Sequence, residues 1–396
     1  MVKDTGVLIK GTSLNNSHIL FAISGGIAAT ESIKIARELR RFQAKVTILM
    51  SKEAEKIITP LAVSWASDSD IITDWDPKMK QLENYDAILV APATRNTISK
   101  HIHGIMDSPM MMALSSARGS KTPLLFVPSM HKDLFDDPVT SDLISKLIEE
   151  GSEVLLEKEY EGKIKQPDPV KIVAKLCNTI NSKLPNRKKI AITLGANRAE
   201  IDSIRSIINT SSGKTGWFLS EYLYRHGHDI TCIVGHTTAN PSFDLTDNKY
   251  CQSPTKMLES CMSLASSEDP PQAWIHVAAV LDYYPNPEVG KKSSGADEWN
   301  IKLITGPKHI PKLSRLVNGT IRIGFKLESN VSNEKLIENA SKLLNNYNLN
   351  AVIGNIKEHI QDDNLPRGVI VLPDGITKIL KNNLDMCSNI ESIISN

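Results

Sequence analysis

Short apolar runs alternate with longer amphipathic runs along this chain, and the alternation restarts about halfway. In the first half, strands are expected at residues 18–23, 45–50, 86–91 and 122–127. Residues 27–41 lie between the first two strands and carry apolar side chains at the spacing of a helix. Strands joined by helices pair in parallel, because each helix carries the chain back to the same edge of the sheet. The first half is therefore predicted to be an α/β domain whose parallel sheet has helices on both faces.

The second half repeats this alternation without repeating the sequence of the first. A polar segment at 185–188 is the predicted boundary, which gives domains at 1–184 and 185–396. The fold class is therefore α/β, with two doubly wound domains. The remaining expected elements are a loop at 157–169, helices at 171–183, 217–224 and 333–347, strands at 189–194, 229–234, 274–278, 321–325 and 351–353, and a terminal hairpin formed by 368–372 and 376–380.

Composition narrows the class of protein. Hydrophobic residues make up 41% of the 396 residues and charged residues 23%, as in soluble globular proteins, and the net charge is only +1. Basic residues are spread along the chain and no apolar run reaches bilayer length, so neither a nucleic-acid partner nor a membrane segment is expected. Five cysteines without metal-type spacing, and a stretch at 1–16 without a signal-peptide core, predict a cytoplasmic protein that begins with a tail or short helix.

The segment 209–216, Asn-Thr-Ser-Ser-Gly-Lys-Thr-Gly, separates an expected strand from an expected helix. Free backbone N–H groups and the positive end of the helix dipole favour a phosphate at such a position. Gly213, Lys214 and Thr215 match the end of a Walker A loop, but that motif needs a glycine where Ile208 stands. The segment therefore predicts a nucleotide or phosphate site that is not a P-loop.

Three expected strands of the first half end in small or polar residues, at 24–29, 91–97 and 128–131. The first of these lacks the G-x-G-x-x-G spacing, and alone it would indicate only a tight turn. Ligands of doubly wound sheets bind beyond the carboxyl ends of the strands. Three such ends in one sheet therefore predict a cofactor crevice.

The first half resembles the FMN-binding cysteine decarboxylase family. The resemblance rests on the S-G-G-I-A-A turn at 24–29, the A-P-A-T segment at 91–94 and the P-x-M strand end at 128–130. The second half is similar to phosphopantothenate–cysteine ligases at 193–195 with 209–214, at 278–283, at 291–295 and at 324–326. The order and fusion of the halves, over roughly 18–380, match the bifunctional family of coenzyme A biosynthesis in its archaeal form.

This resemblance implies a flavoprotein-type domain followed by a Rossmann-like ligase domain. The ligase would join cysteine to 4′-phosphopantothenate with CTP and Mg²⁺, through an acyl-cytidylate. The flavoprotein half would then use FMN to decarboxylate 4′-phosphopantothenoylcysteine to 4′-phosphopantetheine. The resemblance further implies homo-oligomers, with ligase halves as dimers, flavoprotein halves as trimers and the fused protein as a dodecamer.

The resemblance also assigns roles in the ligase half. Asn209 would hold the acyl-cytidylate, Lys291 would neutralise phosphate charge during catalysis, and Asp282 would bind the nucleotide or the magnesium ion. Phe325 would lie near the cytosine, and Lys342 is the remaining lysine of a helix that carries several in bacterial relatives. The other nucleotide-binding residues would be Ser212, Gly213, Ala278 and Ala279.

The FMN-binding residues would be Ser24, Gly25, Gly26, Ser51, Thr94 and Asn96. Two positions depart from bacterial decarboxylases: Lys78 stands near the place of a histidine, and His131 stands where an asparagine follows P-x-M. His131 is either a general acid or a packing residue. The lid segment 161–163 offers only a lysine, since no cysteine precedes Cys177. The alternative is an active ligase joined to an FMN-binding module that does not decarboxylate; a weaker alternative makes both halves nucleotide sensors.

Overall fold

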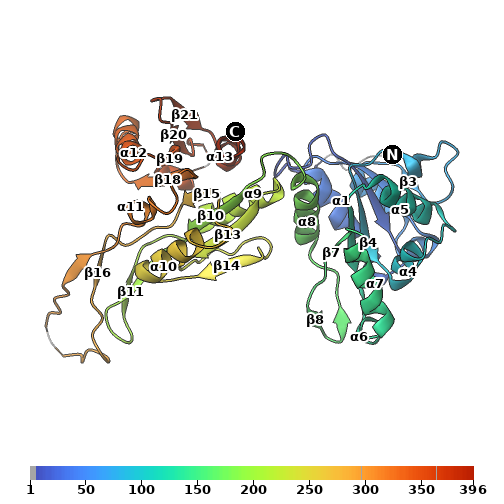
Figure 1. Ribbon diagram of the computed structural model, residues 1–396, viewed down its shortest axis with the longest axis horizontal. Helices are drawn as coiled ribbons and strands as arrows, with labels where there is room; N and C mark the ends of the chain where they lie inside the picture. Colours follow the sequence, from blue (N-terminus) through green and yellow to red (C-terminus); the bar gives the residue numbers. More distant parts are fainter. Residues whose placement is uncertain (1–5, 296, 363) are drawn as a thin grey trace. The chain divides into compact units, whose positions relative to one another are not determined.

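The computed structural model describes residues 6–295, 297–362 and 364–396, which form two compact units (Figure 1). The first unit takes in the chain up to Leu184 together with Arg225–Gly227. The second takes in Pro185–Tyr224 and His228–Asn396. Each is an α/β unit.

The first unit contains a six-stranded sheet in which every neighbouring pair is parallel. The strand order is β3-β2-β1-β4-β5-β7. The order therefore reverses between β1 and β4, the place at which doubly wound sheets bind ligands. The strands are β1 His18–Ile23, β2 Lys45–Met50, β3 Ile71–Ile72, β4 Ala87–Ala93, β5 Leu124–Pro128 and β7 Glu153–Val154.

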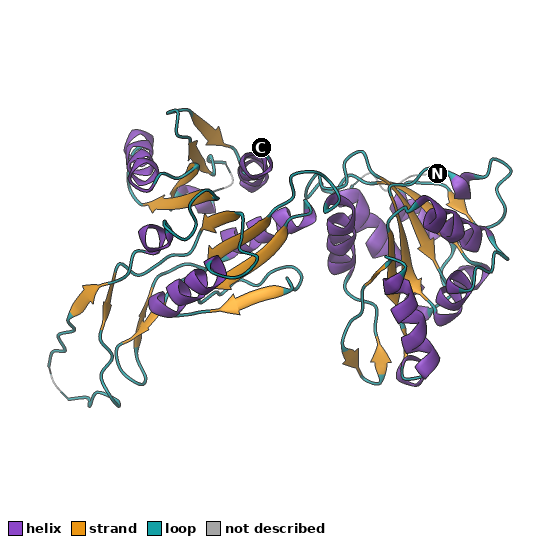
Figure 2. Ribbon diagram, viewed as in Figure 1, coloured by secondary structure: helices purple, strands orange, loops and turns teal. Residues whose placement is uncertain are grey.

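Helices cover both faces of this sheet, as predicted (Figure 2). Side chains of β1 alternate between two separate cores: Ile19 and Phe21 belong to one, and Leu20 and Ala22 to the other. Because successive side chains of a strand point to opposite faces, each core lies under its own layer of helices. The helices are η1 Ile27–Glu31, α1 Ser32–Arg41, α2 Lys52–Glu55, α3 Pro60–Ser67, η2 Lys80–Leu82, α4 Arg95–Ile102, α5 Pro109–Ser120, α6 Lys132–Phe135, α7 Pro138–Glu149 and α8 Pro169–Asn181.

The predicted loop at 157–169 is wrong in part, because it contains two short strands. These are β8 Glu159–Tyr160 and β9 Lys163–Ile164, and β9 also pairs with β6 Met130–His131. Glu161 and Gly162 both have positive φ and form the turn of this hairpin. The two-residue strands are too short to show an alternating pattern in the sequence.

The second unit contains an eight-stranded sheet in the order β14-β13-β10-β15-β18-β19-β20-β21. Pairs from β14 to β19 are parallel, and the predicted hairpin of β20 and β21 is confirmed as an antiparallel edge. The strand order reverses between β10 and β15. The strands are β10 Lys189–Leu194, β13 Asp229–Val234, β14 Asp247–Tyr250, β15 Ala273–His276, β18 Ile321–Glu328, β19 Ala351–Ile356, β20 Gly368–Val371 and β21 Thr377–Leu380.

The sequence interpretation missed several helices of the second unit, among them the last one. The helix α13, Asn383–Ser395, follows the hairpin that was expected to end the fold. Near the N-terminus, the described residues 6–16 contain no helix, and residues 1–5 lie outside the described part. The other helices of the second unit are α9 Lys214–Arg225, α10 Pro254–Ala265, α11 His309–Leu313, α12 Asn333–Tyr347 and η3 His359–Gln361.

Two narrow ribbons, here called the arms, project from this sheet (Figure 1). One pairs β11 Arg198–Glu200 with β12 Ser206–Ile208, and the other pairs β16 Tyr283–Pro285 with β17 Leu303–Thr305. Asp202, at the tip of the first arm, accepts hydrogen bonds from Arg205 Nη1 (2.7 Å) and from the backbone N–H of Lys292 in the second (3.1 Å). The arms therefore brace each other.

Candidate functional site

A crevice of about 530 Å³ opens beyond the carboxyl ends of the strands in the second unit. It is lined by residues 209–216, by residues 277–280 after β15, and by residues 325–327 of β18. This is the reversal point between β10 and β15, and the volume is that of a small-molecule site.

Glycines bring the N-terminus of α9 against the end of β10. Gly213 has φ +79°, and a Cβ atom there would lie 2.5 Å from Cγ2 of Thr237. A side chain on Gly216 would overlap Leu194, the last residue of β10. The first turn of α9 can therefore present its free N–H groups and positive dipole end at the crevice, as the sequence predicts.

Six of the predicted nucleotide-site residues come together here. Asn209 Nδ2 donates to the carbonyl oxygen of Ala279 at 3.0 Å, so its side chain links residues 209–216, here called the phosphate loop, to the segment that follows β15. Phe325 supplies an aromatic wall. The predicted residues that line the crevice are Asn209, Ser212, Gly213, Ala278, Ala279 and Phe325.

The sequence interpretation missed three polar side chains of this crevice, Asn355, Lys357 and Arg367. Asn355 lies near the carboxyl end of β19, where the rule for doubly wound sheets could have found it. Arg367 precedes β20 and is only 6% exposed. Its guanidinium donates to Thr215 Oγ1 (2.9 Å) and to Asn355 Oδ1 (2.6 Å), so it joins the first turn of α9 to β19.

Beside the crevice, His276 ends β15 and is buried. Burial, together with the charges of His309 and Arg322, lowers the pKa of His276 from 6.5 to about 4. Its Nε2 has no hydrogen-bond partner among the described residues. The imidazole is therefore neutral in the folded protein at neutral pH.

In the first unit, hydroxyl groups gather where β1 and β4 end. Ser24 is buried; its Oγ donates to the carbonyl oxygen of Pro92 at 2.7 Å and accepts from the backbone N–H of Thr94 at 2.9 Å. The backbone N–H of Ser51 donates to the carbonyl oxygen of Ile23, the last residue of β1 (3.0 Å). Ser24, Ser51 and Thr94 thus come together at the reversal point.

Helix N-termini and glycines complete the site at the ends of β1 and β4. Ser51 and Thr94 cap the starts of α2 and α4 through their side-chain oxygens, and Asn96 is exposed in the first turn of α4. A side chain on Gly25 would overlap Glu53, and Gly26 has room but is the residue before η1. This set of hydroxyls and helix starts fits the phosphate and carbonyl oxygens of a flavin nucleotide.

Most of the chain matches known proteins. Residues 8–190 match the flavoprotein family model, and residues 186–373 match the DNA/pantothenate metabolism flavoprotein C-terminal domain. The coenzyme A biosynthesis bifunctional protein CoaBC of Thermococcus kodakarensis is 32% identical over 87% of this chain and 87% of its own length. The chain belongs to the CoaBC family. The CoaBC protein of Methanocaldococcus jannaschii is 31% identical, over 94% of this chain and 92% of its own.

A solved structure is also similar. The crystal structure of a DNA/pantothenate metabolism flavoprotein from Streptococcus pneumoniae covers 52% of this chain and 98% of its own, with 21% identity and a TM-score of 0.47.

Three residues predicted from the CoaBC resemblance do not line the crevice. Asp282 and Lys291 are exposed on the second arm, and Lys291 follows Gly290 in the long loop between β16 and β17. Lys342 is exposed on α12, where it forms an ion pair with Glu338. The sequence shows where these residues stand in the family motifs. It does not show which face of the fold, or which chain of an assembly, each side chain points to.

In the flavoprotein half of this CoaBC-family chain, His131 and Lys163 are partners across the β6–β9 pair, and both are exposed. Lys78 is exposed just before η2. Cys177 is fully buried in α8, and burial raises the pKa of its thiol to about 11. Its thiol therefore cannot replace the lid cysteine of the bacterial decarboxylases, whereas Lys163 lies next to His131 on the predicted lid.

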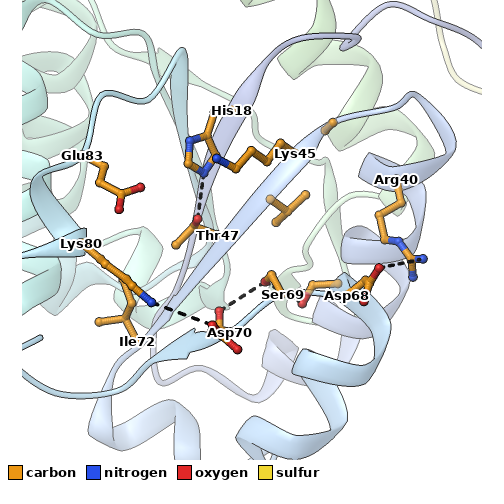
Figure 3. A pocket seen from close by; sticks show the side chains of 13 residues that line it. His18, Arg40, Lys45, Thr47, Asp68, Ser69, Asp70, Ile72, Lys80 and Glu83 are labelled. Carbon is orange, nitrogen blue, oxygen red and sulfur yellow. Dashed lines mark hydrogen bonds and ion pairs between the residues drawn. The ribbon is translucent and has the colours of Figure 1, made fainter. Parts of the chain in front are cut away.

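The first unit also contains a hollow of about 400 Å³ (Figure 3). It lies at the end of the sheet opposite to Ser24, Ser51 and Thr94. His18 and Lys45, at the amino ends of β1 and β2, line it, and His18 Nε2 lies 2.8 Å from Thr47 Oγ1. Burial and the charge of Lys45 lower the pKa of His18. Because this hollow adjoins the amino ends of the strands, it is distinct from the predicted FMN site around Ser24, Ser51 and Thr94, here called the flavin edge.

The described residues contain neither a metal-binding cluster of side chains nor a helix that could cross a membrane. Within residues 6–295, 297–362 and 364–396, no group of three or more His, Cys, Asp or Glu could hold a metal ion. None of the helices in these ranges is both long and apolar enough to cross a membrane.

Proposed function

We propose that this chain catalyses two successive steps of coenzyme A biosynthesis. The second unit joins cysteine to 4′-phosphopantothenate at the expense of CTP, and the first unit decarboxylates the product to 4′-phosphopantetheine. The observation that carries the ligase assignment is the crevice in which Asn209, the phosphate loop and residues 278–279 meet. Membership of the CoaBC family supports the pairing of the two activities.

The crevice suits activation of a carboxylate by a nucleotide. An oxygen of the pantothenate carboxylate attacks the α-phosphorus of CTP, the bond to the β-phosphate oxygen breaks, and pyrophosphate leaves with the electron pair. The cysteine amine then attacks the acyl carbon and displaces CMP, losing a proton. The N-terminus of α9 stabilises negative charge on the phosphates, and Asn209, fixed by Ala279, holds the acyl-cytidylate.

Magnesium and the choice of CTP are part of this proposal. Mg²⁺ in nucleotide sites is commonly held by one or two carboxylates together with substrate phosphates. Asp282 is the carboxylate that we propose for this role. Phe325 offers a ring on which the base can stack.

We propose that two ligase units share their arms. Ile204, Tyr283 and Leu303 of the arms are 64%, 58% and 45% exposed, which favours a partner surface. Lys291 and Asp282 lie on an arm and do not line the crevice of their own chain, so a second chain is proposed to supply them. We further propose that the flavoprotein units form trimers and that the whole protein forms a dodecamer, which combines both symmetries. A cytoplasmic location is also proposed, because a reducing compartment suits the buried free thiols.

For the first unit, we propose that Ser24, Ser51, Thr94 and Asn96 bind FMN with Gly25 and Gly26. When bound, FMN supplies the oxidation of the substrate thiol that lets carbon dioxide leave, and it is restored at the end of the cycle. His131 and Lys163 are the candidate proton donors, because they are exposed on neighbouring strands. Without proton transfer by either, the unit would be an FMN-binding module.

One assay tests both units. Purified protein, with its flavin absorbance recorded, is incubated with 4′-phosphopantothenate, cysteine, CTP and Mg²⁺, and the products are identified by mass spectrometry. A yellow protein that forms 4′-phosphopantetheine is the expected result. If the reaction stops at 4′-phosphopantothenoylcysteine, the ligase assignment stands and the first unit is a binding module. If no cysteine adduct forms, the ligase assignment is rejected.

A further inference from the structure

Arg367 carries a buried positive charge that the folded chain does not neutralise. Its side chain is 6% exposed. Its three hydrogen bonds go to neutral acceptors: Nη1 to Asn355 Oδ1 (2.6 Å), Nε to Asn383 Oδ1 (2.7 Å) and Nη2 to Thr215 Oγ1 (2.9 Å). Among the residues that the structure describes, no carboxylate forms an ion pair with it. A buried charge without a counter-charge is unfavourable, so an anion is expected to complete the site.

The three hydrogen bonds fix the guanidinium group in one orientation. Thr215 belongs to the first turn of α9, Asn355 to β19 and Asn383 to the first turn of α13. A guanidinium group has five N–H donors, so two remain for a ligand. Two parallel N–H groups match a pair of phosphate oxygens.

The surroundings of Arg367 also favour an anion. Arg367 lines the same crevice as Gly213, Lys214 and Thr215. The positive end of α9 and the charge of Lys214 act on the same space. Lys214 and Lys357 also line it but are exposed, whereas the charge of Arg367 is buried, where electrostatic interactions are stronger.

We propose that Arg367 binds the β- and γ-phosphates of the nucleoside triphosphate and stabilises the pyrophosphate that leaves when the acyl-cytidylate forms. This inference rests on the proposed ligase function. As the bond between the α-phosphorus and the bridging oxygen breaks, negative charge grows on the pyrophosphate, and the guanidinium group lies where it can stabilise that charge. Arg367 thus supplies the cation that the exposed Lys342 of α12 does not bring to the crevice.

The first test compares two ligands in the full-length protein by calorimetry in Mg²⁺ buffer. Pyrophosphate carries the proposed β and γ groups, and CMP lacks them. Arg367→Met should raise the Kd of pyrophosphate by at least about tenfold and leave that of CMP within about twofold, with Arg367→Lys between Met and the wild type. Arg315→Met, an exposed arginine outside the crevice, is the matched control and should change neither. Equal losses for both ligands, or no loss for pyrophosphate, would overturn the inference.

A second variant tests the charge without removing Arg367. Asn383→Asp keeps the shape of the side chain and places a carboxylate on the guanidinium Nε, outside the crevice lining. The ion pair should raise the Tm of the protein without ligand and weaken pyrophosphate binding by about fivefold, because the phosphate is no longer the only counter-charge. A raised Tm with unchanged pyrophosphate affinity would show that Arg367 only braces the fold.

These measurements separate the two proposals. Wild-type protein that makes no cysteine adduct, but binds pyrophosphate through Arg367, would reject the ligase function and keep the diphosphate site. An active ligase whose pyrophosphate affinity does not depend on Arg367, or wild-type protein that does not bind pyrophosphate, would reject the inference about Arg367.

Discussion

Replacing Gly213 with alanine should destabilise the phosphate loop by more than the conformational cost of losing a glycine. A control variant can separate the two contributions. Gly213 has φ +79°, which is unfavourable by about 1–2 kcal/mol for a residue with a Cβ atom. The added Cβ would also lie 2.5 Å from Cγ2 and 3.1 Å from Cβ of Thr237. A rotation of Thr237 would move Cγ2 but not Cβ, which is fixed to the backbone, so a tight contact remains, and overpacking of this kind costs about 1–3 kcal/mol.

Gly375 provides the matched control. It lies in the turn between β20 and β21 with φ +78°, and a Cβ atom there would have nothing within 4 Å. Gly375→Ala should therefore lower the free energy of unfolding by the conformational cost alone, about 1–2 kcal/mol. Gly213→Ala should lower it by about 2–5 kcal/mol, the sum of both costs.

The extra cost at Gly213 can appear in either of two measurements. If the loop keeps its position, the Tm of Gly213→Ala should fall below that of Gly375→Ala by roughly 2–4 °C per kcal/mol. If the loop shifts away from Thr237, stability recovers and the Kd of CTP should rise instead, about tenfold for each 1.4 kcal/mol. Thermal unfolding and a CTP titration of both variants check this. Identical Tm and identical CTP affinity in the two variants would refute the reasoning.

Three further predictions concern the arms, the flavin edge and the buried imidazole. Asn209→Ala and Lys291→Gln should each abolish ligation, but co-expression should restore about a quarter of the wild-type rate, because half of randomly paired dimers contain one complete site; no restoration would contradict sharing between chains. Ser24→Ala removes two hydrogen bonds at the ends of β1 and β4 and should weaken FMN binding by about tenfold, measured by flavin fluorescence titration; unchanged affinity would contradict the assignment. The unfolded state takes up a proton on His276 near pH 6.5, whereas the folded state does so only near 4, so the stability that this group contributes is complete above 6.5 and is lost as pH falls toward 4. Urea unfolding between these pH values should show a steeper loss for wild type than for His276→Gln, by up to about 1.4 kcal/mol per pH unit, and equal slopes would contradict a neutral His276.

The sequence predicted the central strands well, because buried parallel strands are continuous apolar runs bounded by turn signals. The expected strands at 45–50 and 189–194 and the expected helix at 333–347 coincide with β2, β10 and α12. The arms escaped prediction because each of their strands is only three residues long, which is too short to establish an alternating pattern in the sequence. For the same reason the two-residue strands β8 and β9 were read as a loop.

The candidate sites were predicted where a motif lies at the end of one strand and depends on its own backbone. Asn209, Gly213 and residues 278–279 are of this kind, and all line the crevice. Arg367 could not be predicted, because its setting is made by Thr215, Asn355 and Asn383 from three distant parts of the chain. The positions of Asp282 and Lys291 depend on how the arms extend from the sheet, which local spacing does not encode.

The exposed apolar side chains of the arms are proposed to pair two chains. Ligase activity should therefore depend on protein concentration. If a crevice is complete only when another chain lends its arm, dilution below the dissociation constant of the dimer should lower the turnover per chain as well as the total rate. The groups that hold Arg367 belong to a single chain, so a diluted chain should keep a measurable affinity for pyrophosphate even without the arm of a second chain. The ratio of turnover to pyrophosphate binding, followed across a dilution series, would then report the fraction of paired chains.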